Sequence, residues 1–296
     1  MRRALSRPSF WGFLFITPWL LGFLIFTAGP MLASFWLSFQ KYDLVHIQFV
    51  GVENYRRLFT ADPLFWKSLK VTISYALLSV PSGILASLAL AMLLNQKVRG
   101  MPIYRACFYI HSLVPAVASA IVWQWMFNAD HGLINRLLGA VGLGRPQWLT
   151  DEKWAVPAFV LMSLWGAGGA RMIIFLAGLQ NIPASYYEAA RIDGASPGRQ
   201  FFSVTLPLLS PVTFFNLVLG VIGSFQVFTT AYVMTGGGPN NASLFYALYL
   251  FQNGFEYMKV GKACALAWVL FSILLMLTGI QFAGSRRWVH YEEDAR

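Results

Sequence analysis

The chain has 296 residues, of which 57% are hydrophobic and only 11% are charged, whereas soluble domains carry roughly 25% charged residues. This composition excludes a soluble globular protein, because a fold of this size could not bury so much apolar surface, and it predicts a membrane protein. The net charge of +10 does not indicate nucleic-acid binding, because the basic residues form short clusters beside apolar runs; membrane lipid headgroups are the expected partner.

Long uncharged runs predict six transmembrane helices, since about 20 residues are needed to cross a hydrocarbon core of about 30 Å. The first run is far longer than a signal-peptide core of roughly 7–15 residues. A further uncharged, aromatic-rich segment, Ala242–Phe255, has only 14 residues and predicts a short helix at the outer interface. The six spans are expected at residues 10–40, 71–96, 106–128, 155–180, 206–234 and 263–285, in a single transmembrane domain covering residues 1–296.

An even number of spans places both termini on one side of the membrane. With the termini inside, the inner segments hold 11 Lys and Arg residues and the outer loops hold 10. The inner segments are shorter, so their positive charge is denser, which favours cytoplasmic termini.

A polar stretch, Ser185–Pro207, separates the fourth and fifth spans. Ser185 and Glu188 stand in S-x-x-E spacing, which predicts a helix start capped by both side chains. Gly194 follows where a left-handed residue would end this helix. Ser196 and the proline after it predict the start of a second short helix.

This stretch resembles the coupling loop of ABC importer permeases. The residues that match the motif are Glu188, Ala189, Ala190, Gly194, Val204, Leu206 and Pro207, with valine at position 204 where isoleucine is commoner. The resemblance extends over most of the chain, including Thr235–Pro239 and Trp148–Gln180. The sequence is most similar to the type I, binding-protein-dependent carbohydrate permeases that import maltose-like sugars or glycerol-phosphate compounds.

The resemblance implies an all-α integral membrane fold with six transmembrane helices and a cytoplasmic helical coupling loop, residues 183–205, between the fourth and fifth. It implies a multi-pass protein of a bacterial or archaeal cytoplasmic (inner) membrane with both termini in the cytoplasm. The implied partners are a second homologous permease subunit, two ATPase subunits and an extracytoplasmic substrate-binding protein. The residues expected to couple this chain to the ATPase are Glu188, Ala189, Ala190, Asp193 and Gly194.

The translocation pathway is expected to be lined by polar or aromatic side chains on apolar helices. For each residue taken alone, an interhelical hydrogen bond or a core aromatic is the alternative interpretation. In the family, substrate contacts fall on the helix between the coupling loop and the Gly-Gly-Gly-Pro turn. The candidates are Ser224, Phe225, Gln226, Phe228 and Asn216 on the fifth span, and Trp165 and Arg171 on the fourth.

Arg171 is unusual because it is a charged residue about four positions inward of the centre of the fourth span. A charge at mid-membrane costs roughly 2.5–3.5 kcal/mol, and no Asp or Glu in any predicted span offsets it. One interpretation is structural: Arg171 reaches inner headgroups or an acid on the partner permease. The other is that it faces the pathway and helps to bind an anionic substrate.

No catalytic constellation is present in the sequence. Gly261-Lys262 resembles the end of a phosphate-binding loop, but Glu256 replaces its first glycine and Ala263 replaces its Ser or Thr. We expect a non-catalytic chain that binds no metal or cofactor, with ATP and magnesium held by the partner ATPase.

The predicted function is sugar or oligosaccharide import. The alternatives are import of an anionic solute, such as a uronic-acid oligosaccharide or a glycerol-phosphate compound, and a self-sufficient secondary transporter. The secondary transporter would require intramembrane acids or broken helices for ion coupling, and the predicted spans contain no acid.

Overall fold

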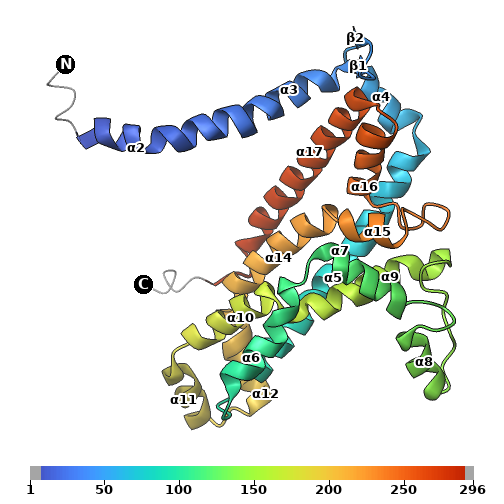
Figure 1. Cartoon of the computed structure of the whole chain (residues 1–296). Helices are drawn as coiled ribbons and strands as arrows, with labels where there is room; N and C mark the ends of the chain where they lie inside the picture. Colours follow the sequence, from blue (N-terminus) through green and yellow to red (C-terminus); the bar gives the residue numbers. More distant parts are fainter. Residues whose placement is uncertain (1–7, 291–296) are drawn as a thin grey trace. The chain divides into compact units, whose positions relative to one another are not determined.

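The computed structural model describes residues 8–290, with side chains from residue 12 onward. Within this range the regular secondary structure is helical apart from two short paired strands (Figure 1), which confirms the predicted all-α fold. In chain order the elements, with η for 3₁₀ or π turns, are α2 (Pro8–Phe23), η1 (Leu24–Ala28), α3 (Gly29–Ser38), β1 (Gln40–Tyr42), β2 (Ile47–Phe49), α4 (Glu53–Thr60), α5 (Pro63–Leu94), α6 (Met101–Tyr109), η2 (Ile110–Leu113), α7 (Ala116–Met126), α8 (Leu133–Ala140), α9 (Glu152–Trp165), η3 (Gly166–Gly168), α10 (Ala170–Asn181), α11 (Ala184–Ile192), α12 (Pro197–Gln200), η4 (Phe201–Thr205), α13 (Leu206–Leu208), α14 (Ser210–Phe225), α15 (Thr229–Met234), α16 (Tyr246–Phe251), η5 (Gln252–Glu256) and α17 (Val260–Ser285).

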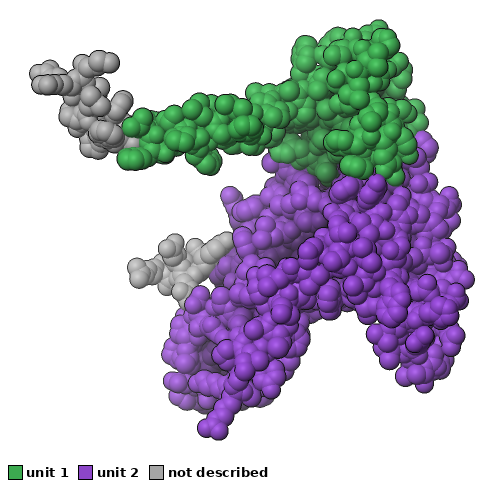
Figure 2. Space-filling view, viewed as in Figure 1, with its two compact units in different colours: residues 1–62, 250–272 green, residues 63–249, 273–296 purple. Residues whose placement is uncertain are grey.

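The chain divides into two compact units, which are coloured separately in Figure 2. Unit 1 holds the residues up to Asp62 together with residues 250–272, and unit 2 holds residues 63–249 and the residues from Ile273 onward. The single domain expected from the sequence stays a prediction.

In the described part of the chain, three helices are long and apolar enough to cross a membrane: Gly12–Ser38, Pro63–Leu94 and Val260–Ser285. Three helix pairs pass the same test together but are bent, by 95° between α6 and α7, by 46° between α9 and α10, and by 64° between Pro197–Leu208 and α14. If each bent pair is one span, residues 8–290 hold up to six, which is the number expected from the sequence. Pro115 accounts for the sharpest bend, because the residue before a proline avoids helical angles and Val114 is extended.

In unit 1, hydrogen bonds join helix α4 to the start of the hairpin that β1 and β2 form. The amide of Asn54 donates hydrogen bonds to the carbonyls of Ser38 and Gln40, both at 2.8 Å. The Tyr55 hydroxyl donates to the Ser38 hydroxyl at 2.6 Å. The first turn of α17 approaches β1 so closely that a Cβ at Gly261 would overlap the Gln40 carbonyl. Glycine is therefore required there.

In unit 2, α5 is the central helix, and α9, α10 and α14 pack against it. Its face at Val80, Ile84 and Leu88 follows the four-residue spacing that places side chains on one side of a helix. This face forms one buried apolar core with Ala91 and Leu94 of the same helix and with residues of other elements: Met101, Met172, Phe175, Leu176, Leu179 and Leu209. A Cβ at Gly178 would lie within 2.9 Å of Leu209 and Val212 side chains, so α10 and α14 cross closely.

The fourth span is interrupted halfway along. α9 ends at Trp165, the turn η3 follows, and α10 begins at Ala170. Three of the four residues between Trp165 and Ala170 are glycines, which are poor helix formers. The Ser87 hydroxyl of α5 donates to the Ala167 carbonyl at 2.9 Å. This hydrogen bond supplies a partner at a break in the helix, where an unpaired carbonyl inside a membrane would be costly.

The backbone of η3 packs directly against the backbone of α6. A Cβ placed on Gly168 would lie 2.8 Å from the Phe108 carbonyl oxygen, closer than real Cβ atoms come. A Cβ on Gly166 would meet nothing within 4 Å. Gly168 is therefore needed for packing, whereas Gly166 borders open space.

Candidate functional site

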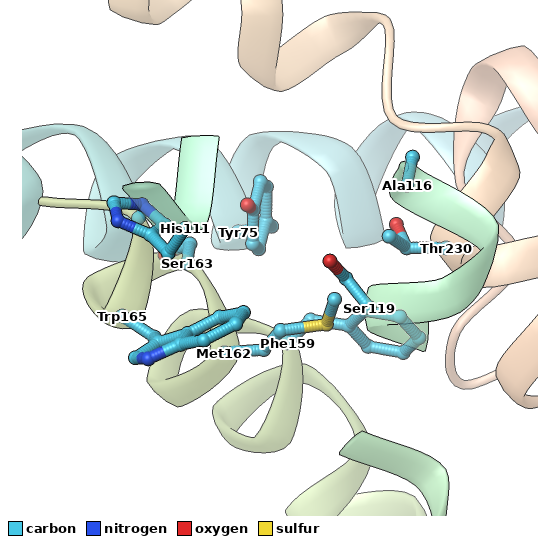
Figure 3. Close-up of a pocket in the computed structure, with 10 residues that line it drawn as sticks. Tyr75, His111, Ala116, Ser119, Phe159, Met162, Ser163, Trp165 and Thr230 are labelled. Carbon is cyan, nitrogen blue, oxygen red and sulfur yellow. The ribbon is translucent and has the colours of Figure 1, made fainter. Parts of the chain in front are cut away.

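A cavity of about 220 Å³ lies in unit 2 among α5, η2, α7, α9 and α15 (Figure 3). Polar side chains come from several elements and face this space: Tyr75, His111, Ser119, Ser163 and Thr230. Trp165, Met162 and Phe159 cover another side in the same view. Hydroxyl groups and an aromatic face together are suited to a ligand that has both hydroxyls and an apolar ring face.

The aromatic wall of this cavity is well supported. The rings of Trp165 and His111 lie 5.2 Å apart, and the rings of Trp165 and Trp123 lie 5.9 Å apart. A ring nitrogen of His111 (Nδ1) is 2.7 Å from the Phe108 carbonyl oxygen, to which a protonated Nδ1 donates. These contacts fix the orientation of Trp165, although 45% of its surface remains exposed.

A second cavity, of about 290 Å³, adjoins the first, since Tyr75, Ser163 and Gly166 line both. It lies among α5, α9, α10 and α14, and its other polar side chains are Ser79, Arg171 and Ser224. No Asp or Glu is among the residues that line it.

Three of the residues predicted for the pathway line these cavities: Trp165, Arg171 and Ser224. Asn216 and Phe225 are buried in α14 and line neither. Gln226 is the exposed residue that ends α14, and Phe228 stacks on Tyr232 with ring centroids 5.7 Å apart. The pathway role of these four residues stays a prediction.

The sequence interpretation missed the contribution of α5. Tyr75 and Ser79 are four residues apart on an otherwise apolar helix, so their side chains share one helix face. That spacing was a readable signal. His111 and Ser119 were not predictable in this way, because the 95° bend between α6 and α7 brings them to the same cavity.

The expected coupling segment forms two short helices. α11 spans Ala184–Ile192 and ends in a left-handed glycine, Gly194 (φ +72°). The Gly194 amide donates to the Arg191 carbonyl at 3.0 Å, and the Ala195 amide donates to the Ala190 carbonyl at 2.8 Å. This is the hydrogen-bond pattern of a Schellman C-cap, and it confirms the predicted turn at Gly194.

The predicted cap at Ser185 is wrong. Helix α11 begins one residue earlier, with Pro183 as its N-cap residue and no side-chain cap. The Pro183 carbonyl accepts a hydrogen bond from the Tyr186 amide at 3.3 Å, so this first-turn amide is paired without a serine cap. The second start is confirmed, because the Ser196 hydroxyl accepts a hydrogen bond from the Arg199 amide at 3.4 Å.

The residues predicted to couple lie on the surface of this segment. Glu188, Ala189, Asp193 and Gly194 are exposed and Ala190 is half-buried. No residue of α11 is buried, and 87% of the Ile192 surface is exposed. The Tyr187 hydroxyl lies 3.0 Å from the Thr205 hydroxyl in a hydrogen bond, which ties α11 to the beginning of the fifth span.

A third, charged hollow of about 790 Å³ lies in unit 1. Lys41, Asp43, Glu53, Arg57 and Lys259 are among the residues that line it. The Arg57 and Arg56 side chains donate hydrogen bonds to Glu53, with Arg57 Nε 2.7 Å from the carboxylate, and hold the pKa of Glu53 below its ordinary value. Any stability from these pairs is present above the ordinary glutamate pKa and is lost as the pH falls through the lowered one.

Comparison with known proteins identifies the family. The family described as "Binding-protein-dependent transport system inner membrane component" matches residues 67–288. The chain belongs to this family. The resemblance inferred from the coupling motif is thereby confirmed, as is a multi-pass protein of the inner membrane.

The similarity to several relatives extends over nearly the whole of both chains. The "Probable ABC transporter permease protein YesP" of Bacillus subtilis is 44% identical over 98% of this chain and 95% of that protein. The "Trehalose/maltose transport system permease protein MalF" of Thermococcus litoralis is 37% identical over 92% of each chain. The "sn-glycerol-3-phosphate transport system permease protein UgpA" of Pectobacterium atrosepticum is 35% identical over 98% of this chain and 99% of that protein.

A solved structure supports the same fold. A chain of a bacterial ABC transporter involved in the import of the acidic polysaccharide alginate superposes with a TM-score of 0.81 over 93% of this permease and 94% of that chain. The sequence identity is 22%, so this likeness concerns the fold alone. It confirms the helical membrane fold that was expected for the permease.

Proposed function

We propose that this permease is a subunit of an ATP-driven, binding-protein-dependent importer of sugars or oligosaccharides, and that it forms half of the translocation pathway. Relatives named as permeases for trehalose and maltose, lactose and arabinooligosaccharides support the solute class. The adjoining cavities of unit 2 also support it, because hydroxyl and aromatic side chains bind sugar hydroxyls and ring faces.

The observation that carries the coupling proposal is the surface of α11. A short helix with no buried residue is not stabilised by packing in its own chain, and Ile192 presents a nearly fully exposed apolar side chain. We assign this surface to the ATPase, with Glu188, Ala189, Ala190, Asp193 and Gly194 at the contact. Tyr187 and Thr205 then transmit movement of α11 to the fifth span.

The proposed assembly contains this permease, a second homologous permease subunit, two ATPase subunits and an extracytoplasmic substrate-binding protein. ATP and magnesium belong to the ATPase, and this chain binds no cofactor and catalyses no reaction. The charged hollow of unit 1 is assigned to the binding-protein side. Both termini lie in the cytoplasm in this arrangement, as α11 must.

The coupling assignment is tested at Ile192. Ile192→Asp should reduce ATPase association and ATP-dependent uptake more than tenfold, because burial of an isoleucine side chain contributes roughly 1.5–3 kcal/mol. The measurement is co-purification of the ATPase with the tagged complex, together with uptake into proteoliposomes. Ile192→Leu is the matched control and should retain both.

Two outcomes would contradict the proposal. Normal ATPase association of Ile192→Asp would remove α11 from the contact. Uptake by the wild-type chain alone in liposomes under an ion gradient would favour a self-sufficient transporter.

The orientation is tested by cysteine labelling after Cys107 and Cys264 are replaced by serine. Val45, 79% exposed in unit 1, is changed to cysteine and should react with an impermeant thiol reagent in intact cells. Gly198→Cys, where a Cβ meets nothing within 4 Å, should react only after permeabilisation. The reverse pattern would overturn both the orientation and the coupling assignment.

A further inference from the structure

Arg171 supplies a positive charge to the cavity of about 290 Å³ in unit 2. It is the second residue of α10, directly after the break in the fourth span. Within residues 8–290 its guanidinium has no hydrogen bond and no ion pair, and no acidic side chain lines the cavity. An ionisable side chain inside a membrane-spanning segment is costly, so Arg171 is a candidate for a functional role.

The surrounding helices are shaped to hold this guanidinium. A Cβ on Gly83 of α5 would lie 2.5 Å from Arg171 Nη1, and a Cβ on Gly220 of α14 would lie 3.5 Å from Nη2. Two glycines on different helices therefore leave the space that the guanidinium occupies. Arg171 is positioned beside the cavity by α5 and α14.

The end of α10 adds to the same positive field. This helix has 12 residues, and its N-cap residue, Gly169, has no side chain that could cap the first amides. Helix N-termini carry partial positive charge and amide donors, and broken membrane helices use such ends to hold anionic groups of substrates. The guanidinium and the helix end both favour an anion in the cavity.

The other side chains that line the cavity indicate which class of ligand bears the anionic group. Tyr75, Ser79, Ser163 and Ser224 bring hydroxyls to this cavity, and Tyr75 and Ser163 continue into the cavity that holds Trp165. An anion site beside hydroxyls and an indole face suits a sugar ring that bears a carboxylate.

We propose that Arg171 binds the carboxylate of an acidic saccharide, a uronic-acid residue or oligosaccharide, as it passes the middle of the membrane. This inference rests on the proposed importer function and narrows its solute class. The named solutes of the relatives include both neutral sugars and an organic phosphate, so the assignment depends on Arg171 and its cavity.

The test measures thermal unfolding of the purified permease complex with galacturonate, galactose or inorganic phosphate at equal concentration. Galacturonate should raise the melting temperature of the wild-type complex, and galactose and phosphate should raise it less. Arg171→Gln should weaken galacturonate binding roughly ten- to hundredfold, because hydrogen bonds to a charged group are lost. Arg171→Lys should retain part of the shift, since it keeps the charge without the planar fork.

The unliganded melting temperature separates binding from a structural role. If Arg171 only supports packing, Arg171→Gln lowers this temperature; if it binds a ligand, the unliganded temperature does not fall, because the variant removes an unpaired charge from the membrane. Equal shifts with galactose, or an Arg171→Gln complex that keeps the galacturonate shift, would overturn the proposal, and a larger shift with phosphate would overturn its saccharide part. A different result would contradict the proposed importer function: a wild-type complex that binds no ATPase or shows no ATP-dependent uptake.

Discussion

Gly194→Val should reduce ATP-dependent uptake about tenfold while leaving the affinity of the binding protein for its solute unchanged. Gly194 has φ +72°, and left-handed angles cost an L-residue roughly 1–2 kcal/mol, more for a β-branched one. Valine would therefore break the C-cap hydrogen bonds to Ala190 and Arg191 and displace α11. Uptake into proteoliposomes and solute binding by the isolated binding protein are the two measurements.

Two controls separate backbone conformation from bulk at this turn. A Cβ at Gly194 meets nothing within 4 Å, so Gly194→Asn, which tolerates left-handed angles, should retain most of the uptake. Gly198→Val adds the same side chain at an open position without a positive φ and should be nearly neutral. If Gly194→Asn fails as badly as Gly194→Val, left-handed conformation is not the reason for glycine at this position.

Gly168→Val should lower the free energy of unfolding of unit 2 by about 1–3 kcal/mol, the range typical of overpacked sites. Its Cβ would lie 2.8 Å from the Phe108 carbonyl oxygen, a backbone atom that cannot rotate away. The turn η3 and α6 would have to separate, which would also disturb the hydrogen bond from Ser87 to Ala167. A lowered melting temperature and a lower yield of purified complex are expected.

Gly166→Val is the matched control two residues away. Its Cβ meets nothing within 4 Å, so the melting temperature should stay within error of the wild type. Gly166 lines both cavities of unit 2, so uptake should nevertheless fall as the space narrows. Equal melting temperatures for Gly166→Val and Gly168→Val would mean that η3 does not pack against α6 as described.

That residues 8–290 hold up to six spans was predictable, because long apolar runs can be read directly from the order of the residues. The bends were not, because a hydropathy window averages over short interruptions. Gly166, Gly168 and Gly169 were visible in the fourth span, but only packing against α6 and Ser87 shows that they end one helix and begin another. Pro115 was a clearer sequence signal for the bend between α6 and α7 than the glycines were for the bend in the fourth span.

The candidate site was predictable only in part. Trp165, Arg171 and Ser224 could be found because polar or aromatic groups stand out on apolar helices. Asn216 looked equivalent in the sequence, yet its amide donates to the Val212 carbonyl at 3.0 Å on its own helix. Which face of a helix meets a cavity depends on its neighbours, and a single sequence does not record them.

The first membrane helix has a consequence for mutational mapping. In the most apolar 18-residue window of Gly12–Ser38, 0% of the residues are buried within this chain. The corresponding share for Pro63–Leu94 is 44%. Substitutions along this helix therefore report on its surroundings rather than on its own fold. Fluid acyl chains accept any apolar side chain, whereas a protein neighbour selects for shape and small size. A saturation scan of this helix would show stripes of intolerance wherever another subunit touches it, and uniform apolar tolerance wherever lipid does.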